Sequence, residues 1–361
     1  MKKLIYKIVL TVNILFALAL LASYISVHIR PDIFAFPALL GLSYPYLLLI
    51  NILFALLWII FLKAEAFISI AVIAMGLTHF SNYIRLRKPS GDKTGTFEVL
   101  SYNVRLFNYY ENKKPVSSER RIMELLKNHQ PEIICLQELY FQGDPERKEA
   151  ALRSALGNRY HSHLKVISTG RNRYYGVATL TRFPIVNRGE IYHPRSSSIS
   201  IFTDIVIESD TFRIFNNHLE SFRLQRRERS FAAELTEASG DKEAVSELRS
   251  ISRSLRQGYK RRAAQAQILK DRINKTSYPV IVAGDFNDTP VSFTYRKIRK
   301  GLNDSFLTSG YGAGFTYSGN YPPNRIDYIL YGNGLECRQF DIMKINYSDH
   351  YPIIAYFRKK N

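Results

Sequence analysis

The stretch Tyr278-Pro-Val-Ile-Val-Ala-Gly-Asp285-Phe-Asn287 joins an apolar, β-branched run to a polar turn. The run predicts a strand over residues 278–283. Asp285 and Asn287 follow it, and residues two apart in an extended turn project to the same side. A glycine–aspartate turn with a local hydrogen bond would explain this one stretch equally well. The same arrangement recurs along the chain, however, and the repetition gives it weight.

Further polar motifs come at or just after the ends of other strand-like runs. They are Ser-Tyr-Asn103, Leu-Gln-Glu138, Tyr175-Gly176 with Arg182, Asn-Asn-His218, Arg-Ile-Asp327-Tyr and Ser-Asp349-His350. Because side chains at strand ends can converge on one edge of a sheet, these motifs predict a metal-dependent phosphoryl-transfer site.

The region beyond residue 95 alternates between strand and helix patterns. Strands are predicted over residues 97–104, 131–138, 176–181, 200–208, 212–217, 278–283, 326–331 and 353–357, and helices over 119–128 and much of 222–274. Many strands interrupted by a few helices predict an α/β fold of four layers, a sandwich of two packed mixed β-sheets flanked by helices. Cys135 and Cys337 lie in apolar runs and are expected in the core, which excludes a disulfide framework.

The first 88 residues have a different composition and predict a transmembrane segment. Residues 8–26 and 39–62 are long enough to cross a bilayer, and residues 66–83 form a weaker third candidate. A cleaved signal peptide is the alternative for the first run, and an interfacial helix for the third. Residues 89–96 read as a linker to a catalytic domain over 97–361.

The number of spans decides where the catalytic domain lies. With a cytoplasmic amino terminus, three spans put it outside the cytoplasm and two keep it inside. Lys63 favours three spans, whereas Arg85, Arg87 and Lys88 would prefer the cytoplasm. We expect an integral protein of a bacterial inner membrane with an extracytoplasmic catalytic domain.

The net charge of +19 favours an acidic partner, which could be nucleic acid, anionic lipid headgroups or phosphorylated small molecules. The basic residues are densest over 223–275, where glutamates are interleaved. A solvated helical face and a binding patch are both compatible with this region. His161 and His163 have no partner motif and are expected at the surface.

Taken together and in order, the motifs resemble those of the endonuclease/exonuclease/phosphatase superfamily over roughly residues 95–359. This superfamily includes pancreatic-type deoxyribonucleases, abasic-site endonucleases, inositol-polyphosphate 5-phosphatases and bacterial sphingomyelinases. The resemblance implies a Mg²⁺-dependent hydrolase, with Mn²⁺ as a possible substitute, that cleaves phosphodiester or phosphomonoester bonds by in-line attack of water. His218 stands where abasic-site enzymes have a tyrosine, which favours the other branches.

The resemblance also implies a role for each motif. Glu138 would be the principal metal ligand, and Asp349, Asn103 and Asp285 would complete the metal site. Asp285 would orient and deprotonate the attacking water or hold a second metal, and Asn287 would donate its amide to a phosphate oxygen or to that water. Asp327 would raise the basicity of His350. His218 would contact the phosphate and help protonate the leaving oxygen. Asn103, Tyr175 and Arg182 are expected on the substrate side.

The expected partners are the phosphate-ester substrate and the lipid bilayer, and no protein partner can be inferred from the sequence. Within the same chemistry, a sphingomyelinase-like activity on phospholipid headgroups or an inositol-phosphate phosphatase activity is the alternative to a nuclease-like one. A non-catalytic membrane binding protein on the same fold is a further alternative, which predicts that catalytic positions have been lost.

Overall fold

The computed structural model describes residues 3–89, 91–109, 115–194, 196–222, 242–319 and 323–360. The chain divides into two compact units. We call the first the N-terminal unit, and it consists of Met1–Tyr83, Phe222–Ala264 and Asp288–Lys297. We call the second the sheet unit, and it consists of Ile84–Ser221, Gln265–Asn287 and Ile298–Asn361.

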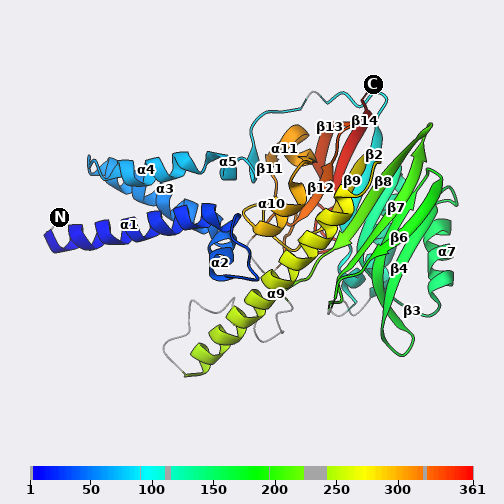
Figure 1. Cartoon of the computed structure of the whole chain (residues 1–361), viewed down its shortest axis with the longest axis horizontal. Helices are drawn as coiled ribbons and strands as arrows, with labels where there is room; N and C mark the ends of the chain where they lie inside the picture. Colours follow the sequence, from blue (N-terminus) through cyan, green and yellow to red (C-terminus); the bar gives the residue numbers. More distant parts are fainter. Residues whose placement is uncertain are drawn as a thin grey trace. The chain divides into compact units, whose positions relative to one another are not determined.

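The sheet unit contains two six-stranded mixed sheets (Figure 1). The first has the strand order β13-β14-β2-β3-β5-β4, and only β2 and β3 run parallel. Its strands are β2 (Phe97–Asn103), β3 (Ile133–Gln142), β4 (His161–Gly170), β5 (Arg173–Thr181), β13 (Leu335–Ile342) and β14 (Ile353–Lys359). Of these, β4 and β13 were not predicted as strands.

The second sheet has the order β10-β12-β9-β8-β7-β6, and only β8 and β9 run parallel. Its strands are β6 (Ile185–Ile191), β7 (Ile199–Ile207), β8 (Asp210–His218), β9 (Val280–Asp285), β10 (Asn303–Asp304) and β12 (Asp327–Tyr331). Two short strands, β1 (Ile84–Arg85) and β11 (Gly312–Ala313), form a separate pair.

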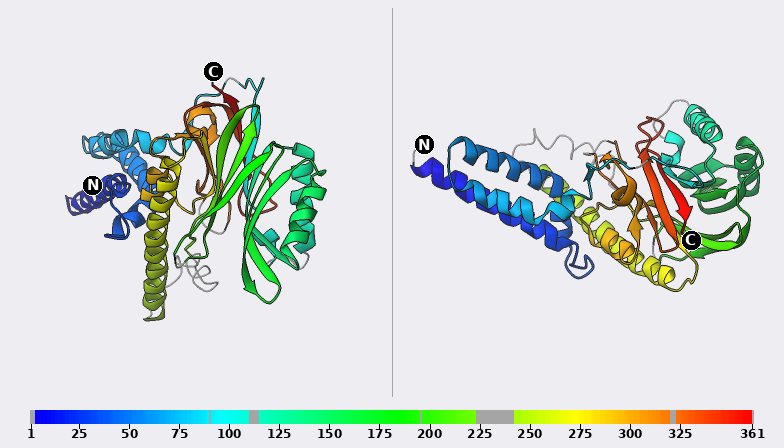
Figure 2. Two further views of the ribbon diagram at one scale, coloured as in Figure 1. Left: turned by 45° about the vertical axis from the view of Figure 1, so that its right-hand side comes forward. Right: turned by 90° about the horizontal axis from the view of Figure 1, so that it is seen from above.

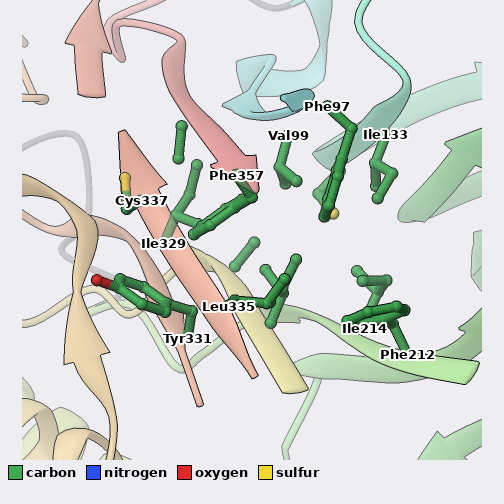
Figure 3. Packing of buried hydrophobic residues seen from close by; sticks show 14 of the residues in the cluster. Phe97, Val99, Ile133, Phe212, Ile214, Ile329, Tyr331, Leu335, Cys337 and Phe357 are labelled. Atoms are coloured by element: carbon green, nitrogen blue, oxygen red, sulfur yellow. The ribbon is translucent and has the colours of Figure 1, made fainter. Parts of the chain in front are cut away.

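The main core lies between the two sheets. Figure 3 shows Phe97, Val99 and Ile133 of the first sheet facing Phe212 and Ile214 of the second. Because successive strand residues point to opposite faces, the neighbours of Ile133 on β3 serve the other side of the sheet. Ile134 and Leu136 belong to a second core under the flanking helices. The prediction that this strand is buried on both faces is therefore confirmed.

Helices cover the outer faces of the sheets, as Figure 2 shows. α6 (Pro115–His129) and α7 (Pro145–Ala155) place Ile122, Leu126 and Leu152 in the second core. The other helical elements are η1 (Arg105–Asn108), α9 (Lys242–Asn274), α10 (Phe293–Arg299) and α11 (Ser305–Ser309). The predicted four-layer α/β sandwich is confirmed. Of the helix predicted within 222–274, residues 223–241 lie outside the described part of the chain.

The predicted burial of the cysteines and the predicted exposure of two histidines can be compared with the structure. Cys135 and Cys337 are free and buried, as predicted. His163 is only 7% exposed, so its predicted surface position is wrong, whereas His161 is exposed. His161 and His163 lie on the same face of β4, but His163 packs against β7, where its Nδ1 lies 2.9 Å from Thr203 Oγ1. His161 begins the strand and stays exposed.

The first 83 residues of the N-terminal unit form five apolar helices of different lengths. They are α1 (Lys3–Ser26), α2 (Phe36–Leu42), α3 (Tyr44–Ile60), α4 (Ala66–Met75) and α5 (Leu77–Phe80). By length and composition, α1 alone can cross a membrane, or α1 together with the α2–α3 pair if that pair, bent by 64°, counts as one span. The third predicted run breaks at Gly76, so α4 is shorter than a span and a third crossing stays a prediction.

Hydrogen bonds between buried polar side chains join α1, α3 and α4. Asn13 of α1 donates to Ser69 Oγ at 2.7 Å and accepts from Trp58 Nε1 at 2.9 Å. Ser69 donates to Asn51 Oδ1 at 3.2 Å. In an apolar surrounding such bonds satisfy each polar group, and they fix how these helices pack together.

Candidate active site

Glu138 reaches the site because β3 departs from regular strand geometry at this residue. The pairing of β3 with β5 shifts register between Leu136 and Leu139, and Glu138 has a φ of 54°. A left-handed conformation is unfavourable for a residue with a Cβ, and a bulge of this kind re-aims a side chain. The backbone strain is therefore located at the residue expected to be the principal metal ligand.

The turn after β9 has the same character. Gly284 has a φ of 132°, and a Cβ there would lie 2.0 Å from the carbonyl oxygen of Asn217, so only glycine fits. Asn287 has a φ of 51°, and its backbone N–H donates to Asp285 Oδ1 at 2.7 Å. The local hydrogen bond considered as the alternative explanation is thus present, and it holds Asp285 at the end of its strand.

The carboxylates of Glu138 and Asp285 are brought together by the amide of Asn103 at the end of β2. Its Nδ2 donates to Asp285 Oδ2 at 2.9 Å and to Glu138 Oε1 at 3.2 Å. Its Oδ1 accepts from the backbone N–H of Arg105 at 2.9 Å. Asn103 therefore positions the two carboxylates in this geometry, and its predicted role as a metal ligand stays a prediction.

His350 and Asp327 form the predicted pair. His350 Nδ1 lies 3.0 Å from Asp327 Oδ2, and both residues are buried. The other ring nitrogen, Nε2, lies 3.8 Å from Asp285 Oδ2. The ring of Tyr317 packs edge-on against the imidazole at a centroid distance of 5.0 Å. Tyr317 and Asp327 thus fix the orientation of the ring.

His218 lies at the end of β8 between two different neighbours. Its Nε2 is 3.1 Å from Glu138 Oε1 and 3.8 Å from Asp285 Oδ2. Its Nδ1 is 2.5 Å from the hydroxyl of Tyr175, a residue of β5. Asn287 Nδ2 approaches the same histidine at 3.3 Å and donates to the backbone oxygen of Leu219 at 3.0 Å. The predicted residues Tyr175, His218 and Asn287 thus belong to one contact network.

Asp349 lies at the edge of this cluster. Its Oδ2 accepts from Arg105 Nε at 3.0 Å, and its Oδ1 is 3.9 Å from His350 Nε2. Ser348 fixes the loop, since its hydroxyl donates to the backbone oxygen of Asn103 at 2.8 Å. Asp349 is therefore close enough to take part in a metal site that includes the His350 side of the cluster.

Burial and neighbouring charges perturb the titration of these groups. Burial favours the neutral form of Glu138, but the hydrogen bond and charge of His218 outweigh it and lower the pKa of Glu138 to about 2. Burial and the nearby Asp327 raise the pKa of Asp285 despite both histidines. Burial opposes protonation of His350, yet Asp327 and Asp285 raise its pKa to about 10. Burial raises the pKa of the Asp349 carboxyl, although His350 and Arg105 oppose the shift.

The donor set fits a hard divalent cation. Two groups of side chains have one ligand atom each within 4.8 Å of one another, Glu138 with His218 and Asp285, and Asp285 with Asp327 and His350. Asp285 is common to both groups. Carboxylate oxygens are the ligands such ions prefer, and a cation would relieve the repulsion among buried carboxylates that raises the pKa of Asp285.

One predicted site residue lies elsewhere. Arg182 follows β5 and forms an ion pair with Glu132 at 3.4 Å and a hydrogen bond with Gln130 at 2.9 Å. β5 runs antiparallel to β3, so Arg182 lies beside the start of β3, roughly 15 Å from Glu138 by strand length. The predicted substrate-side role of Arg182 is wrong, because the residue closes the opposite end of the sheet.

Three residues near the site were not singled out from the sequence. Arg105 and Tyr317 contact Asp349 and His350, and Gln137 donates to Asn216 Oδ1 at 2.8 Å in the buried layer between the sheets. Gln137 and Asn216 belong to the motifs that end in Glu138 and His218. Their closeness in sequence to these two residues could have indicated that they lie near the site. Tyr317 is far from His350 in sequence, and nothing in its local pattern reveals the contact.

Comparison with known proteins agrees with the family resemblance of the sequence motifs. The family model described as "Endonuclease/Exonuclease/phosphatase family" matches residues 100–350. A second family model, described as a domain of unknown function (DUF8431), matches residues 6–83. No curated protein matches the chain at a significant level.

Solved structures share the fold at low sequence identity. An endonuclease/exonuclease/phosphatase family protein from Leptotrichia buccalis C-1013-b has a TM-score of 0.53 and 18% identity, covering 73% of this chain and 100% of that chain. The human Nocturnin catalytic domain with bound sulfate anion has a TM-score of 0.52 and 19% identity, covering 74% and 95%. D. rerio TDP2 complexed with a single-strand DNA product has a TM-score of 0.53 and 15% identity, covering 73% and 99%.

The family match spans most of the chain and includes most of the sheet unit with its cluster of carboxylates and imidazoles. The chain therefore belongs to the endonuclease/exonuclease/phosphatase family and is a metal-dependent hydrolase of phosphate esters.

Proposed function

We propose that the chain is a membrane-anchored, Mg²⁺-dependent phosphoesterase that hydrolyses a phosphodiester or phosphomonoester bond by in-line attack of water. The observation that carries this proposal is the position of Asp285, which lies 3.8 Å from an Nε2 atom of both His218 and His350 and is bridged to Glu138 by Asn103. One carboxylate thus connects the expected metal ligand with both imidazoles.

Mg²⁺ is the ion that this donor set suits, because Glu138, Asp285 and Asp349 offer carboxylate oxygens and leave room for phosphate and water. Mn²⁺ accepts the same oxygen ligands and should substitute for it. When bound, the ion would neutralise charge on the phosphate oxygens. Glu138, with its pKa lowered to about 2, is ionised and ready to bind a cation across the neutral pH range.

The remaining residues have complementary roles in the proposal. Asp285 accepts a proton from the attacking water, and the amide of Asn287 orients that water or a phosphate oxygen. His350, held by Asp327, presents Nε2 to the phosphate. His218 donates a proton toward the leaving oxygen, and Tyr175 holds its ring in place. Each step uses a group whose hydrogen-bond partner is already fixed.

The membrane part of the proposal rests on α1, whose 24 residues would extend about 36 Å, enough to cross the hydrocarbon core. We place the protein in a bacterial inner membrane, with its sheet unit outside the cytoplasm. Arg171 is exposed in the sheet unit and Cys135 and Cys337 are buried, so Arg171→Cys should react with an impermeant maleimide in spheroplasts. Labelling only after lysis would contradict this orientation.

The activity can be tested on the full chain in mild detergent. We expect hydrolysis of bis-p-nitrophenyl phosphate or p-nitrophenyl phosphate with Mg²⁺, loss in EDTA, and recovery with Mn²⁺. Glu138→Gln should abolish both hydrolysis and Mg²⁺ binding measured by calorimetry, whereas the exposed control Glu208→Gln should alter neither. Hydrolysis that survives EDTA or Glu138→Gln would contradict the proposal, as would inactivity with both ions.

The substrate class then follows from a side-by-side assay. DNA, RNA, sphingomyelin and inositol phosphates each represent one branch of the family chemistry considered above. The bond that the site cleaves is identified by the substrate with the highest kcat/KM. Hydrolysis of that substrate should also be lost in Glu138→Gln.

A further inference from the structure

Four basic side chains line one face of α9 within the N-terminal unit. Arg249, Arg253, Arg256 and Lys260 are separated by four, three and four residues, which places them on a single stripe of the helix. All four are exposed. We call them the α9 basic stripe. It extends over roughly 16 Å of helix axis.

The opposite face of α9 packs within the same unit. Gly258 and Arg262 lie on that face, and both are buried. A Cβ at Gly258 would lie 2.9 Å from the ring of Phe222, and Arg262 stacks over that ring at 4.2 Å. Arg262 Nε also contacts Asp288 Oδ2 at 3.2 Å. These contacts hold α9 so that the α9 basic stripe faces away from the unit.

No acidic residue is interleaved with the four members of the α9 basic stripe. Residues 248–270 contain no aspartate or glutamate. Among the described residues, none forms an ion pair with Arg249, Arg253, Arg256 or Lys260. Like charges spaced three or four residues apart repel one another on a helix. An anionic surface that binds all four would relieve this repulsion.

The same unit contains the apolar helices that are proposed to enter the membrane. Phe222–Ala264 clusters with Met1–Tyr83, and the backbone oxygen of Val291 in this unit would lie 2.3 Å from a Cβ at Gly41 of α2. The α9 basic stripe is therefore carried by the unit that is anchored in lipid. A tether of this kind keeps the stripe at a high effective concentration near the headgroups.

We propose that the α9 basic stripe binds the anionic phospholipid headgroups of the bilayer that holds the N-terminal helices. This inference rests on the membrane anchoring in the proposed function. Charge complementarity supports it, because juxtamembrane lysine and arginine clusters bind anionic lipid. Nucleic acid fits less well, since the exposed residues beside the stripe, Ser252 and Gln257, offer no aromatic ring on which a base could stack.

A label beside the stripe reports its surroundings. Ser252 is exposed, and both native cysteines are buried, so Ser252→Cys in the full chain can be labelled selectively with an environment-sensitive fluorophore. After reconstitution into nanodiscs, we expect a blue shift with 30% phosphatidylglycerol but not with phosphatidylcholine alone. The shift should decrease at high salt, because salt screens exposed charges.

Replacing Arg249, Arg253, Arg256 and Lys260 with Gln should abolish the shift, lowering the bound-to-free ratio of the helix on the order of a thousand-fold. The matched control replaces four exposed arginines of the sheet unit, Arg153, Arg159, Arg171 and Arg173, and should retain it. Both variants should hydrolyse a soluble nitrophenyl ester like the native chain.

The outcomes separate this inference from the proposed function. Insertion is checked first by flotation with lipid, and a chain that does not insert contradicts both the anchoring and the lipid contact. An inserted, active chain whose label ignores phosphatidylglycerol overturns the lipid contact alone. A label that ignores phosphatidylglycerol but responds to single-stranded DNA in phosphatidylcholine nanodiscs would assign the stripe to nucleic acid instead.

Discussion

The surroundings of His350 and of His218 are built alike but differ in one chemical group. In both, a ring Nδ1 contacts a residue of the opposite sheet, and Nε2 lies 3.8 Å from Asp285. His350, just before β14, has the carboxylate of Asp327 at 3.0 Å, whereas His218 on β8 has the phenol of Tyr175 at 2.5 Å. The two imidazoles therefore share Asp285 and differ at Nδ1, and His218 Nε2 has Glu138 as an additional neighbour at 3.1 Å.

The difference indicates where each imidazole obtains its charge. Burial lowers the pKa of His350, and Asp327 is the main group that raises it. The protonated form of His350 is therefore stabilised through its Nδ1 side. Tyr175 offers a hydroxyl to His218 Nδ1 in place of a carboxylate. Burial opposes protonation of His218 as well, and Glu138 is what raises its pKa. His218 thus depends chiefly on Glu138, whereas His350 depends chiefly on Asp327.

The largest effect is expected from Asp285, which both surroundings share. Asp285→Asn keeps the shape but removes the acceptor for the water proton and the carboxylate near both Nε2 atoms. We expect kcat to fall by about 10³-fold or more. Steady-state hydrolysis with saturating Mg²⁺ measures this, and Asp341→Asn, at a partly exposed residue of β13, serves as control. A loss of less than about tenfold would show that the two imidazoles do not act through a common carboxylate.

Removal of Asp327 should affect the His350 side alone. Asp327→Asn takes away the main group that raises the pKa of His350, so this pKa should fall. We expect kcat to fall about 10²- to 10⁴-fold, as when an imidazole loses its supporting carboxylate. If His350 acts as the cation, the alkaline limb of the kcat profile should move to lower pH. An unchanged profile would contradict the pairing.

The two surroundings also show how far the sequence could predict this site. The motifs predicted both histidines, Glu138, Asp285 and Asp327, because each lies beside a strand-like run in the sequence and the family order indicates which runs meet. The role of Tyr175 was harder to predict, since its motif gave only a general substrate-side assignment. Its contact with His218 depends on β5 and β8, which lie in different sheets. Contacts across sheets leave no periodic signal along the chain.

The errors have a similar physical origin. Arg182 shares a motif with Tyr175, but seven residues of strand separate the two, and a strand of that length carries them to opposite ends of the sheet. β6 and β13 were not predicted because charged residues interrupt their apolar alternation, and β4 was not predicted because it is mostly polar at both ends. The left-handed backbone of Glu138 and Asn287 could not be predicted either, because it follows from the bulge and turn rather than from the side chains.

His163 offers a contrast within the same unit, since it is buried beside a hydroxyl and has no carboxylate partner at its Nδ1. Burial lowers its pKa to about 4. The unfolded chain takes up this proton near pH 6.5, so stability falls as the pH drops from about 6.5 to about 4.

This histidine should account for roughly 2 kcal/mol of that loss. His163→Gln should remove this part of the pH dependence, and hydrogen exchange of β4 and β7 between pH 7 and pH 4.5 measures it. The exposed His161→Gln is the control, and an identical slope in the native chain and in His163→Gln would show that His163 does not titrate in this range.

The smallest effect is expected from Tyr175→Phe, which tests the His218 side of the comparison. The change removes one neutral hydrogen bond to Nδ1, worth about 1 kcal/mol, so kcat should fall about five- to tenfold. KM should change little and the alkaline limb of the kcat profile should stay in place, because Glu138 is the main group that raises the pKa of His218.

Tyr175→Glu would give His218 a carboxylate like that of His350. NMR titration of the His218 ring measures how far its protonation in this variant still depends on Glu138. A weaker dependence would show that the phenol of Tyr175 causes the difference between the two imidazoles. An unchanged titration would show that another group in the site causes it.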